Sequence, residues 1–343
     1  MRVRHPGFRP SWLFFVFGFT FAAIPARGEL VAKLPQVMAP YFMTISDGRF
    51  YVVENNSTAH FFTIGDKGVA FVKTFGREGQ GPGEFDFMYR IRILENHLDI
   101  SGSHKLARFS LDGEYIDEVK VPIGMFKGAI HRFGENYLAG DFNFDSKEST
   151  RTIRLYDRDF KLIREIGAHK EPMGLEKINL VSDVYSPRVI GDQIFVGASG
   201  KDTIVTVYDR NGLRQNEVRL PLEPTKMTAA LKEIIVKPIK EDRERRMAWS
   251  EYEKRLYFPD QTPGLDYFDV VDGKFIARAY KYRDDSVEFV IFDLRGRELQ
   301  RMFLPFTGRL SNGLFFCFYQ GRYFYLRENA EEEVWELHSE KVW

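Results

Sequence analysis

Short apolar runs alternate with turn residues along most of the chain. The first group of runs comprises Phe42–Ser46, Arg49–Glu54, Thr58–Ile64 and Val69–Phe75. Asp47-Gly48 separates the first two runs, and an Asp-Gly pair suits a tight hairpin because it tolerates positive φ. This arrangement predicts a unit of four antiparallel β-strands.

The same order of strands and turns recurs along the chain. Later hairpin turns fall at Glu95-Asn96, Gly134-Glu135, Gly191-Asp192, Asp272-Gly273 and Gln320-Gly321. The turn before the last strand of each unit ends at Gly68, Gly113, Phe160, Gly212 and Gly296, at intervals of 45, 47, 52 and 84 residues. A period in the forties with four strands per unit predicts an all-β fold, the β-propeller.

The longest interval contains a segment with a different periodicity, from about residue 225 to 257. Met227, Leu231, Ile234 and Ile235 keep helical spacing, and Pro238 is expected to divide the segment into two helices. We therefore predict a six-bladed β-propeller with a helical insertion between blades 4 and 5. The sixth unit reaches Trp343 without a fourth strand, and Leu30–Val37 is expected to supply it and close the ring.

The N-terminal segment is typical of a secretory signal peptide. Arg2, Arg4 and Arg9 precede an apolar run of 13 residues, and Ala26-Arg27-Gly28 follows it. A membrane span needs roughly 20 apolar residues. Residues 1–28 are thus predicted to be a signal peptide and 29–343 the mature propeller, periplasmic or extracellular; the alternative is an uncleaved anchor.

Charge and cysteine content limit the partners. Without residues 1–28 the chain has 45 basic and 49 acidic residues, a net charge of −4. This balance argues against a nucleic-acid partner. The single cysteine, Cys317, cannot form an internal disulfide, so a packed core must hold the fold. We expect a monomer that meets a membrane only during export.

The Gly-rich segment from Phe75 to Phe85 carries a family resemblance. Its Gly79-Gln-Gly-Pro-Gly-Glu-Phe85 motif, together with the repeated Tyr-Asp-Arg turns, resembles the NHL-type six-bladed β-propeller proteins that bacteria export. The resemblance covers essentially the whole mature chain and implies the fold. Relatives include RNA binders, an amidating lyase and sugar-lactone hydrolases, so it does not select an activity. The motif lacks the Gly-Lys-Ser/Thr end of a phosphate-binding loop, which favours a structural turn.

Propeller geometry places the candidate site among the loops of one face. This loop face carries the connections between blades and the loops between each blade's second and third strands. Loops on a rigid scaffold often carry function, and the candidate binding residues there are Glu54, Asn55, Arg77, Asp141, Trp249, Tyr252 and Arg283. The insertion has a net charge of +3 from Lys226 to Tyr257 and is either a lid or partner surface, or a solvated helical pair packed through its apolar stripe.

These features favour a non-enzymatic scaffold that binds a protein, peptide or glycan, with no catalytic residue and no cofactor. The alternative, resembling the lactonase and amidating-lyase branches, is a metal-dependent hydrolase or lyase. It would hold one Ca or Zn at the channel mouth through Glu54, Asn55, Asp141 and Asp285. A calcium loop starting at Asp141 is disfavoured by Ser146 and Thr152 at its sixth and twelfth positions. A third hypothesis is an assembly role through an apolar patch on the outer wall.

Overall fold

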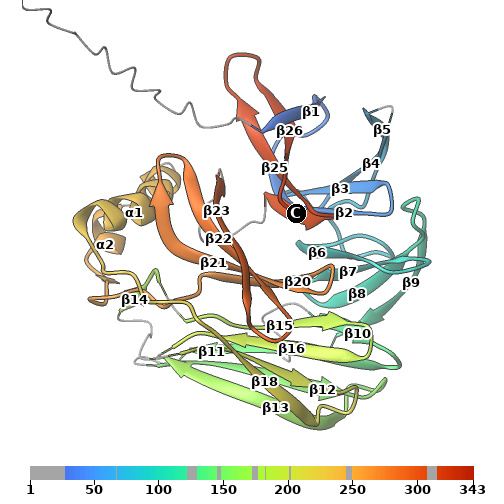
Figure 1. Cartoon of the computed structure of the whole chain (residues 1–343). Helices are drawn as coiled ribbons and strands as arrows, with labels where there is room; N and C mark the ends of the chain where they lie inside the picture. The colour runs from blue at the N-terminus through green and yellow to red at the C-terminus, as the bar shows by residue number, and fades with distance from the viewer. Residues whose placement is uncertain are drawn as a thin grey trace, which may run out of the picture.

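The computed structural model describes residues 28–343 except 67, 122–129, 145–147, 172–176, 182, 201, 245–248 and 307–314. The predicted signal peptide thus lies outside the described residues, apart from Gly28. Six four-stranded antiparallel sheets surround a common centre (Figure 1). The chain is therefore a six-bladed β-propeller, as the repeat predicts.

The first three blades follow one another in the chain, and each runs from its central to its outer strand. Blade 1 contains β2 (Pro40–Ser46), β3 (Arg49–Glu54), β4 (Ala59–Gly65) and β5 (Gly68–Phe75). Blade 2 contains β6 (Met88–Ile93), β7 (Leu98–Gly102), β8 (Lys105–Phe109) and β9 (Tyr115–Lys120). Blade 3 contains β10 (Ile130–Phe133), β11 (Asn136–Phe144), β12 (Ser149–Tyr156) and β13 (Leu162–Glu171).

Blades 4 and 5 follow in the chain, and blade 6 combines three C-terminal strands with the N-terminal strand β1. Blade 4 contains β15 (Tyr185–Ile190), β16 (Gln193–Ala198), β17 (Thr203–Tyr208) and β18 (Arg214–Leu220). Blade 5 contains β20 (Tyr267–Val271), β21 (Lys274–Arg283), β22 (Ser286–Asp293) and β23 (Glu298–Pro305). Blade 6 contains β24 (Phe316–Tyr319), β25 (Arg322–Asn329), β26 (Val334–Lys341) and β1 (Glu29–Leu34).

The first strand of the described chain closes the ring. β1 pairs antiparallel with β26, from Glu29 opposite Ser339 to Leu34 opposite Trp335. Leu34 is only 1% exposed and packs in the cluster between blades 6 and 1. The predicted N-terminal strand is confirmed, although it ends at Leu34 where the chain turns: the Val37 N–H donates to the Leu34 carbonyl. Closure satisfies a sheet edge that would otherwise be free to pair with other chains.

The recurrent Asp-containing turns have a common hydrogen-bond pattern. The side-chain oxygen of Asp157 accepts the N–H groups of residues two and four positions later, and Asp209 and Asp293 do the same. The residue that ends such a turn has positive φ, which explains the glycine in most copies and makes Phe160, at φ 59°, the exception. The turn signals in the sequence therefore reflect local chemistry.

Apolar side chains fill the spaces between neighbouring blades. The cluster between blades 1 and 2, for example, contains Tyr51, Phe61, Phe85 and Leu98. Each of the other five pairs of neighbouring blades has a comparable cluster between them. Each blade thus buries both faces, and this burial is the main stabilising contribution.

The Gly-rich segment is the joint between blades 1 and 2. The buried Phe85 donates its N–H to the Arg77 carbonyl at 2.9 Å, and the Gly79 N–H donates to the Phe85 carbonyl at 3.2 Å. The Glu84 carboxylate accepts the Gly81 N–H at 2.8 Å. Gly79 has a φ of 151°, and a Cβ there would lie 2.2 Å from that carboxylate, so another residue would be strained and would displace the Glu84 side chain. The interpretation as a structural turn agrees with these contacts.

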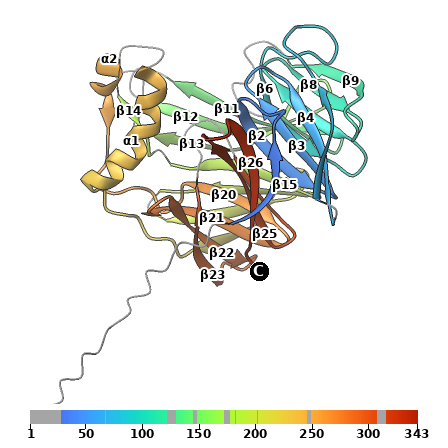
Figure 2. The ribbon, with the colours of Figure 1, turned by 90° about the horizontal axis from the view of Figure 1, so that it is seen from above.

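The helical segment follows β18 and precedes β20 in the chain. It contains α1 (Ala229–Glu244) and α2 (Trp249–Glu253), with the short parallel pair β14 (Ile178–Asn179) and β19 (Leu256–Tyr257) beside them. The helices lie on the side of the molecule away from β6–β9 (Figures 1 and 2). Leu231 and Ile235 of α1 are buried against Tyr280 of blade 5.

The predicted division of the helix at Pro238 is wrong, because α1 continues through this residue. Proline removes the hydrogen bond to the carbonyl of Ile234, a residue that is 40% exposed, so water can solvate that carbonyl. The apolar stripe packed on the propeller, Leu231 and Ile235, holds the part of the helix that precedes the proline. The expectation of a helix docked through its apolar stripe is confirmed.

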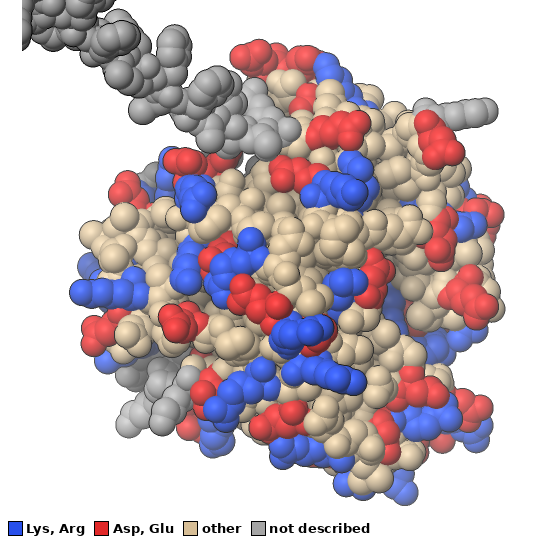
Figure 3. Space-filling view, viewed as in Figure 1, with Lys and Arg blue, Asp and Glu red and all other residues tan. Residues whose placement is uncertain are grey.

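Acidic and basic side chains are interspersed over the face seen in Figure 3. No large area of a single charge is visible there, so this face does not present a broad electrostatic field to a partner. None of the helices that the structure describes has the length and apolar character needed to cross a membrane.

Candidate functional site

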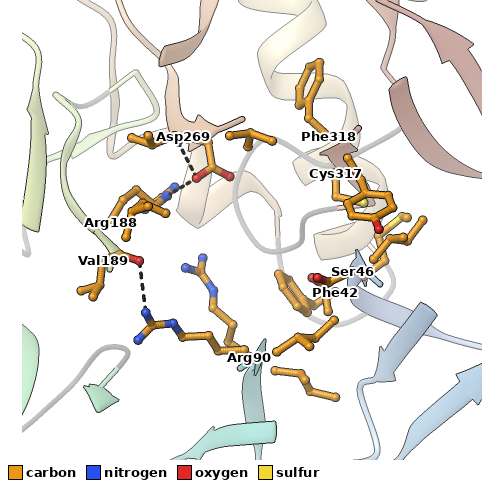
Figure 4. A pocket seen from close by; sticks show the side chains of 18 of the residues that line it. Phe42, Ser46, Arg90, Arg188, Val189, Asp269, Cys317 and Phe318 are labelled. Carbon is orange, nitrogen blue, oxygen red and sulfur yellow. Dashed lines mark hydrogen bonds and ion pairs between the residues drawn. The ribbon is translucent and has the colours of Figure 1, made fainter. Parts of the chain in front are cut away.

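A cavity of about 470 Å³ occupies the centre of the ring, and we call it the central channel. The innermost strand of every blade contributes to its wall: β2, β6, β10, β15, β20 and β24. Figure 4 shows the side chains that line it. Because each wall strand belongs to a packed blade, the channel is pre-formed.

Strand alternation directs charged groups into the channel. In β6, Ile91 is buried between blades 1 and 2, while Arg90 and Arg92 line the channel. In β20, Phe268 and Val270 are buried between blades 4 and 5, and Asp269 lines the channel. Successive side chains of a strand point to opposite sides, so one pattern builds both core and cavity.

Arg188 and Asp269 form an ion pair across neighbouring strands. The Arg188 Nε donates to Asp269 Oδ1 at 3.0 Å, and the side chains are 13% and 29% exposed. Asp269 also accepts the Tyr267 hydroxyl at 2.6 Å and the Val270 N–H at 2.9 Å. Burial lowers the pKa of Arg188, but Asp269 and Tyr267 outweigh that effect and leave it raised. This arginine is held in place by its partners.

Arg92 is also occupied, by backbone acceptors. Its guanidinium donates to the Arg132 carbonyl at 2.9 Å and to the Val189 carbonyl at 3.1 Å. These bonds link β6 to β10 and β15 across the channel wall. Arg92 therefore connects three blades, and two of its five N–H donors serve the fold.

Arg90 differs from the other two arginines. Its guanidinium extends into the channel (Figure 4) and lies 5.6 Å from the centre of the Phe42 ring. No hydrogen bond or ion pair joins it to another described residue. Burial, and then the positive charge of Arg188, lower the pKa of Arg90, but a guanidinium stays protonated in proteins. Arg90 thus presents to the cavity a positive charge that no described residue pairs.

The remaining polar groups do not cancel this charge. Burial lowers the pKa of His131 well below its usual value, and Arg90, Arg92 and Arg188 add to the effect, so the imidazole is neutral at pH 7. The acids of the lining are Asp269 and Asp272. Three arginines against two carboxylates leave the wall with a positive balance.

Cys317 is half-buried and lies on the wall of the channel. Burial raises the pKa of its thiol, so it is not a thiolate at neutral pH. It remains the single thiol of the chain and can serve as a chemical reporter of the channel.

The residues predicted on the loop face lie outside the lining of this channel. Glu54 is buried and accepts the Met38 and Ala39 N–H groups, and it lies 3.4 Å from His60. Asn55 is exposed, and its backbone N–H donates to the Ala39 carbonyl. Arg77 is mostly exposed and pairs with Glu84.

The other predicted residues belong to different blades. Asp141 of β11 is 3.5 Å from Arg154, and Arg283 of β21 stacks 4.1 Å above the Phe303 ring. The Trp249 and Tyr252 rings both lie on α2, with their centres 5.7 Å apart. Among the seven predicted binding residues, this is the one pair for which the described part of the chain gives a ring contact. Within the described part of the chain, no three His, Cys, Asp or Glu side chains are grouped closely enough to hold a metal ion. The proposed metal ligands, including the exposed Asp285, come from three blades.

Sequence reasoning did not select the arginines of the channel. The available signal was the pattern Arg-Ile-Arg-Ile from Arg90 to Ile93 on the first strand of a blade. On the innermost strand of a propeller blade, every second side chain points into the channel. Charged residues at those positions therefore indicate the lining of the channel. Arg188 and Asp269 occupy the corresponding strands of blades 4 and 5.

Comparisons with known proteins agree with the architecture. A family model described as DUF5128, 6-bladed beta-propeller, matches residues 37–186. No curated protein matches the chain.

Solved structures similar to the chain share little sequence with it. The WD40 β-propeller domain of Doa1 is 10% identical with a TM-score of 0.45, over 91% of this chain and 97% of that chain. The C-terminal WD40 domain of Sif2 is 10% identical with a TM-score of 0.40, over 88% and 82%. The computationally designed Ika8 protein is 10% identical with a TM-score of 0.39, over 91% and 99%. The family model and the six observed sheets together identify the chain as a six-bladed β-propeller.

Proposed function

We propose that the protein is an exported, non-enzymatic binding protein whose central channel receives the ligand. The main support is the cavity of about 470 Å³ with charged groups directed into it. Small-molecule sites in proteins commonly measure about 300–1,000 Å³ and are largely pre-formed. The channel meets both conditions, since its walls are strands of six packed blades.

The channel contains polar groups that the fold does not use. Arg90 has no carboxylate partner among the described residues, and the side chains of Thr44 and His131 also line the cavity. A charge enclosed by protein without a partner costs folding free energy. Arg90 therefore does not stabilise the fold, and binding of a ligand accounts for its position in the channel.

Export is the second part of the proposal and rests on the sequence. β1 begins at Glu29, so cleavage after Gly28 would leave the closing strand whole in the mature chain. The loop face, with Glu54, Asn55, Arg77, Asp141, Trp249, Tyr252 and Arg283, remains the candidate surface for a protein, peptide or glycan partner. The helical insertion between blades 4 and 5 would then border that surface.

The channel is tested by a variant that fills it. Thr44→Trp places an indole on the channel wall, whereas Thr63→Trp makes the same change at an exposed position of β4 and serves as the matched control. A panel of acidic, neutral and basic metabolites is screened by thermal denaturation, because a ligand that binds only the native state raises its stability. We expect hits that stabilise the wild type and Thr63→Trp but not Thr44→Trp. Equal stabilisation of both variants would place the ligand elsewhere.

Export is tested by expressing the full chain and measuring the intact mass of the protein recovered from each cell fraction. A mature chain that begins at Glu29 in the exported fraction is expected. A full-length chain retained inside the cell would contradict this part of the proposal.

A further inference from the structure

We propose that Arg90 is the anion-binding group of the central channel, and that the ligand presents a carboxylate or a phosphate to it. This inference rests on the proposed function, since it takes the channel as the ligand site. It adds the chemical class of the ligand and the residue that recognises it.

The three arginines of the channel differ in what their guanidinium groups already bind. Arg188 donates to Asp269 at 3.0 Å and to Ser186 Oγ at 2.8 Å. Arg92 donates to two backbone carbonyls at 2.9 and 3.1 Å. Arg90 has the Phe42 ring at 5.6 Å and no hydrogen-bond acceptor among the described residues. None of its five N–H donors is thus used by the described part of the chain, which leaves them to a ligand.

The surroundings of Arg90 select an anion over a cation or a neutral group. Arg188 lowers the pKa of Arg90 and Asp269 raises it, but the Asp269 carboxylate is already bound by Arg188 and Tyr267. An arriving anion would meet the net positive charge of three arginines against two carboxylates, inside low-dielectric walls where electrostatic attraction is stronger than in water. A cation would be repelled by the same groups.

The guanidinium geometry further restricts the partner. Its planar fork matches two oxygens of one carboxylate or phosphate, and such charge-assisted bonds are stronger than neutral ones. The cavity of about 470 Å³ exceeds a bare oxyanion, so the rest of a metabolite-sized molecule fits beside the charged end. The neutral His131 and the hydroxyl of Thr44 supply further hydrogen-bonding groups on the wall.

The first experiment measures binding of citrate and of inorganic phosphate by titration calorimetry at low ionic strength. Citrate represents the carboxylates and phosphate the phosphates, so the stronger probe identifies the oxyanion class. The protein is the full folded chain in three forms: wild type, Arg90→Gln and Arg90→Lys. Arg158→Gln is the matched control, because it removes the same charge from a side chain that is 79% exposed on an outer turn.

We expect at least one probe to bind the wild type, and Arg90→Gln to weaken its binding by about ten- to a hundredfold. Arg90→Lys should be intermediate, since lysine keeps the charge but loses the fork. Arg158→Gln should remain within about twofold of the wild type, as expected for an exposed charge. Equal affinity of Arg90→Gln and wild type, or no binding of either probe, would overturn the assignment of Arg90.

A second readout needs no ligand. Cys317, the single thiol, is modified with two methanethiosulfonates of similar size, one carrying a sulfonate and the other a trimethylammonium group. The ratio of their rates reports the charge of the channel, because the reactivity of the thiol is common to both. We expect the anionic reagent to be favoured in the wild type and the ratio to fall in Arg90→Gln. An unchanged ratio would contradict the inference.

The two proposals can fail separately. If a neutral ligand binds in a way that Thr44→Trp abolishes while citrate and phosphate do not bind, the channel stands and Arg90 is not its anion site. If citrate binds equally to the wild type and to Thr44→Trp, the channel itself is wrong. Circular dichroism of each variant confirms that it has folded.

Discussion

A buried ion pair in blade 5 permits a quantitative prediction. The Arg278 Nε donates to Asp266 Oδ2 at 2.6 Å, and the two side chains are 5% and 9% exposed. The Arg278 guanidinium also lies 4.3 Å from the centre of the Phe306 ring and 5.5 Å from that of Phe316. Asp266 is thus the anion that balances a charge enclosed by aromatic rings.

The perturbation is Asp266→Asn, which keeps the shape of the side chain and removes its charge. Breaking a buried pair from one side typically costs about 3–5 kcal/mol, because the remaining charge is left without a counterion. The ring contacts persist in the variant and each contributes about 0.5–2 kcal/mol. We therefore expect the free energy of unfolding to fall by about 3 kcal/mol.

Removing both charges should be far less harmful. Asp266→Asn combined with Arg278→Met leaves no buried charge, and replacing both members of such a pair by uncharged groups is often nearly neutral. We expect the double variant to be more stable than Asp266→Asn alone. The coupling between the two positions is then measured by a double-mutant cycle.

Urea denaturation followed by intrinsic fluorescence gives the four free energies of unfolding, compared at a common m-value. Asp159→Asn is the matched control, because Asp159 faces Arg158 at 3.9 Å and both side chains are about 80% exposed. This control should change stability by less than about 0.5 kcal/mol. A loss below about 1 kcal/mol for Asp266→Asn, or additive losses in the cycle, would refute the reasoning.

Three further predictions concern a turn, the closing strand and a histidine. Gly296→Ala should lose at least about 1 kcal/mol more than Gly273→Ala, because both residues have positive φ but only a Cβ at Gly296 would meet a carbonyl of blade 4, at 2.5 Å. Leu34→Ala should lose about 2–5 kcal/mol and Leu30→Ala, at a position 47% exposed, less than about 0.5. Folding lowers the pKa of His131, so the unfolded chain takes up a proton first as the pH falls below about 6.5. The free energy of unfolding of the wild type should therefore fall by up to about 1.4 kcal/mol per pH unit more than that of His131→Asn.

Urea denaturation tests all three, with the histidine pair measured at pH 7.5 and 5.5. Equal losses at the two glycines would show that the clash is relieved, and equal losses at the two leucines would show that β1 does not stabilise the ring. Parallel pH dependence of the wild type and the histidine variant would mean that His131 titrates normally in the folded protein.

The architecture could be predicted from the sequence because its signals are local. The turn at Asp209 needs only a side chain that accepts nearby N–H groups and a glycine at Gly212. The same side-chain chemistry recurs at Asp157 and Asp293 in two other blades. The closing strand was predictable from a missing strand at one end and a spare one at the other. The boundary predicted at Pro238 was wrong, because tertiary packing of α1 outweighs the local free-energy cost of a proline.

The channel could not be predicted in the same way because its residues are far apart in the sequence. Arg90 and Arg188 are polar residues on strands in which polar and apolar residues alternate. From the local sequence alone, neither can be told apart from a residue that faces solvent. Only the closed ring brings them to one cavity. Conversely, Glu54 looks like an available loop carboxylate, but it accepts two backbone N–H groups. Sequence patterns indicate polarity; they do not indicate which polar groups are already bound.

Ring closure also makes the fold depend on two strands that lie far apart in the chain, β1 and β26. Glu29 pairs with Ser339, so β1 has no partner until β26 has been synthesised. A chain that stops before β26 keeps two open sheet edges, which are sites for aggregation and proteolysis. Pairing of such distant segments is slow, since the intervening chain must first be ordered. The β1–β26 ladder thus distinguishes a chain that contains both strands from one that ends before β26.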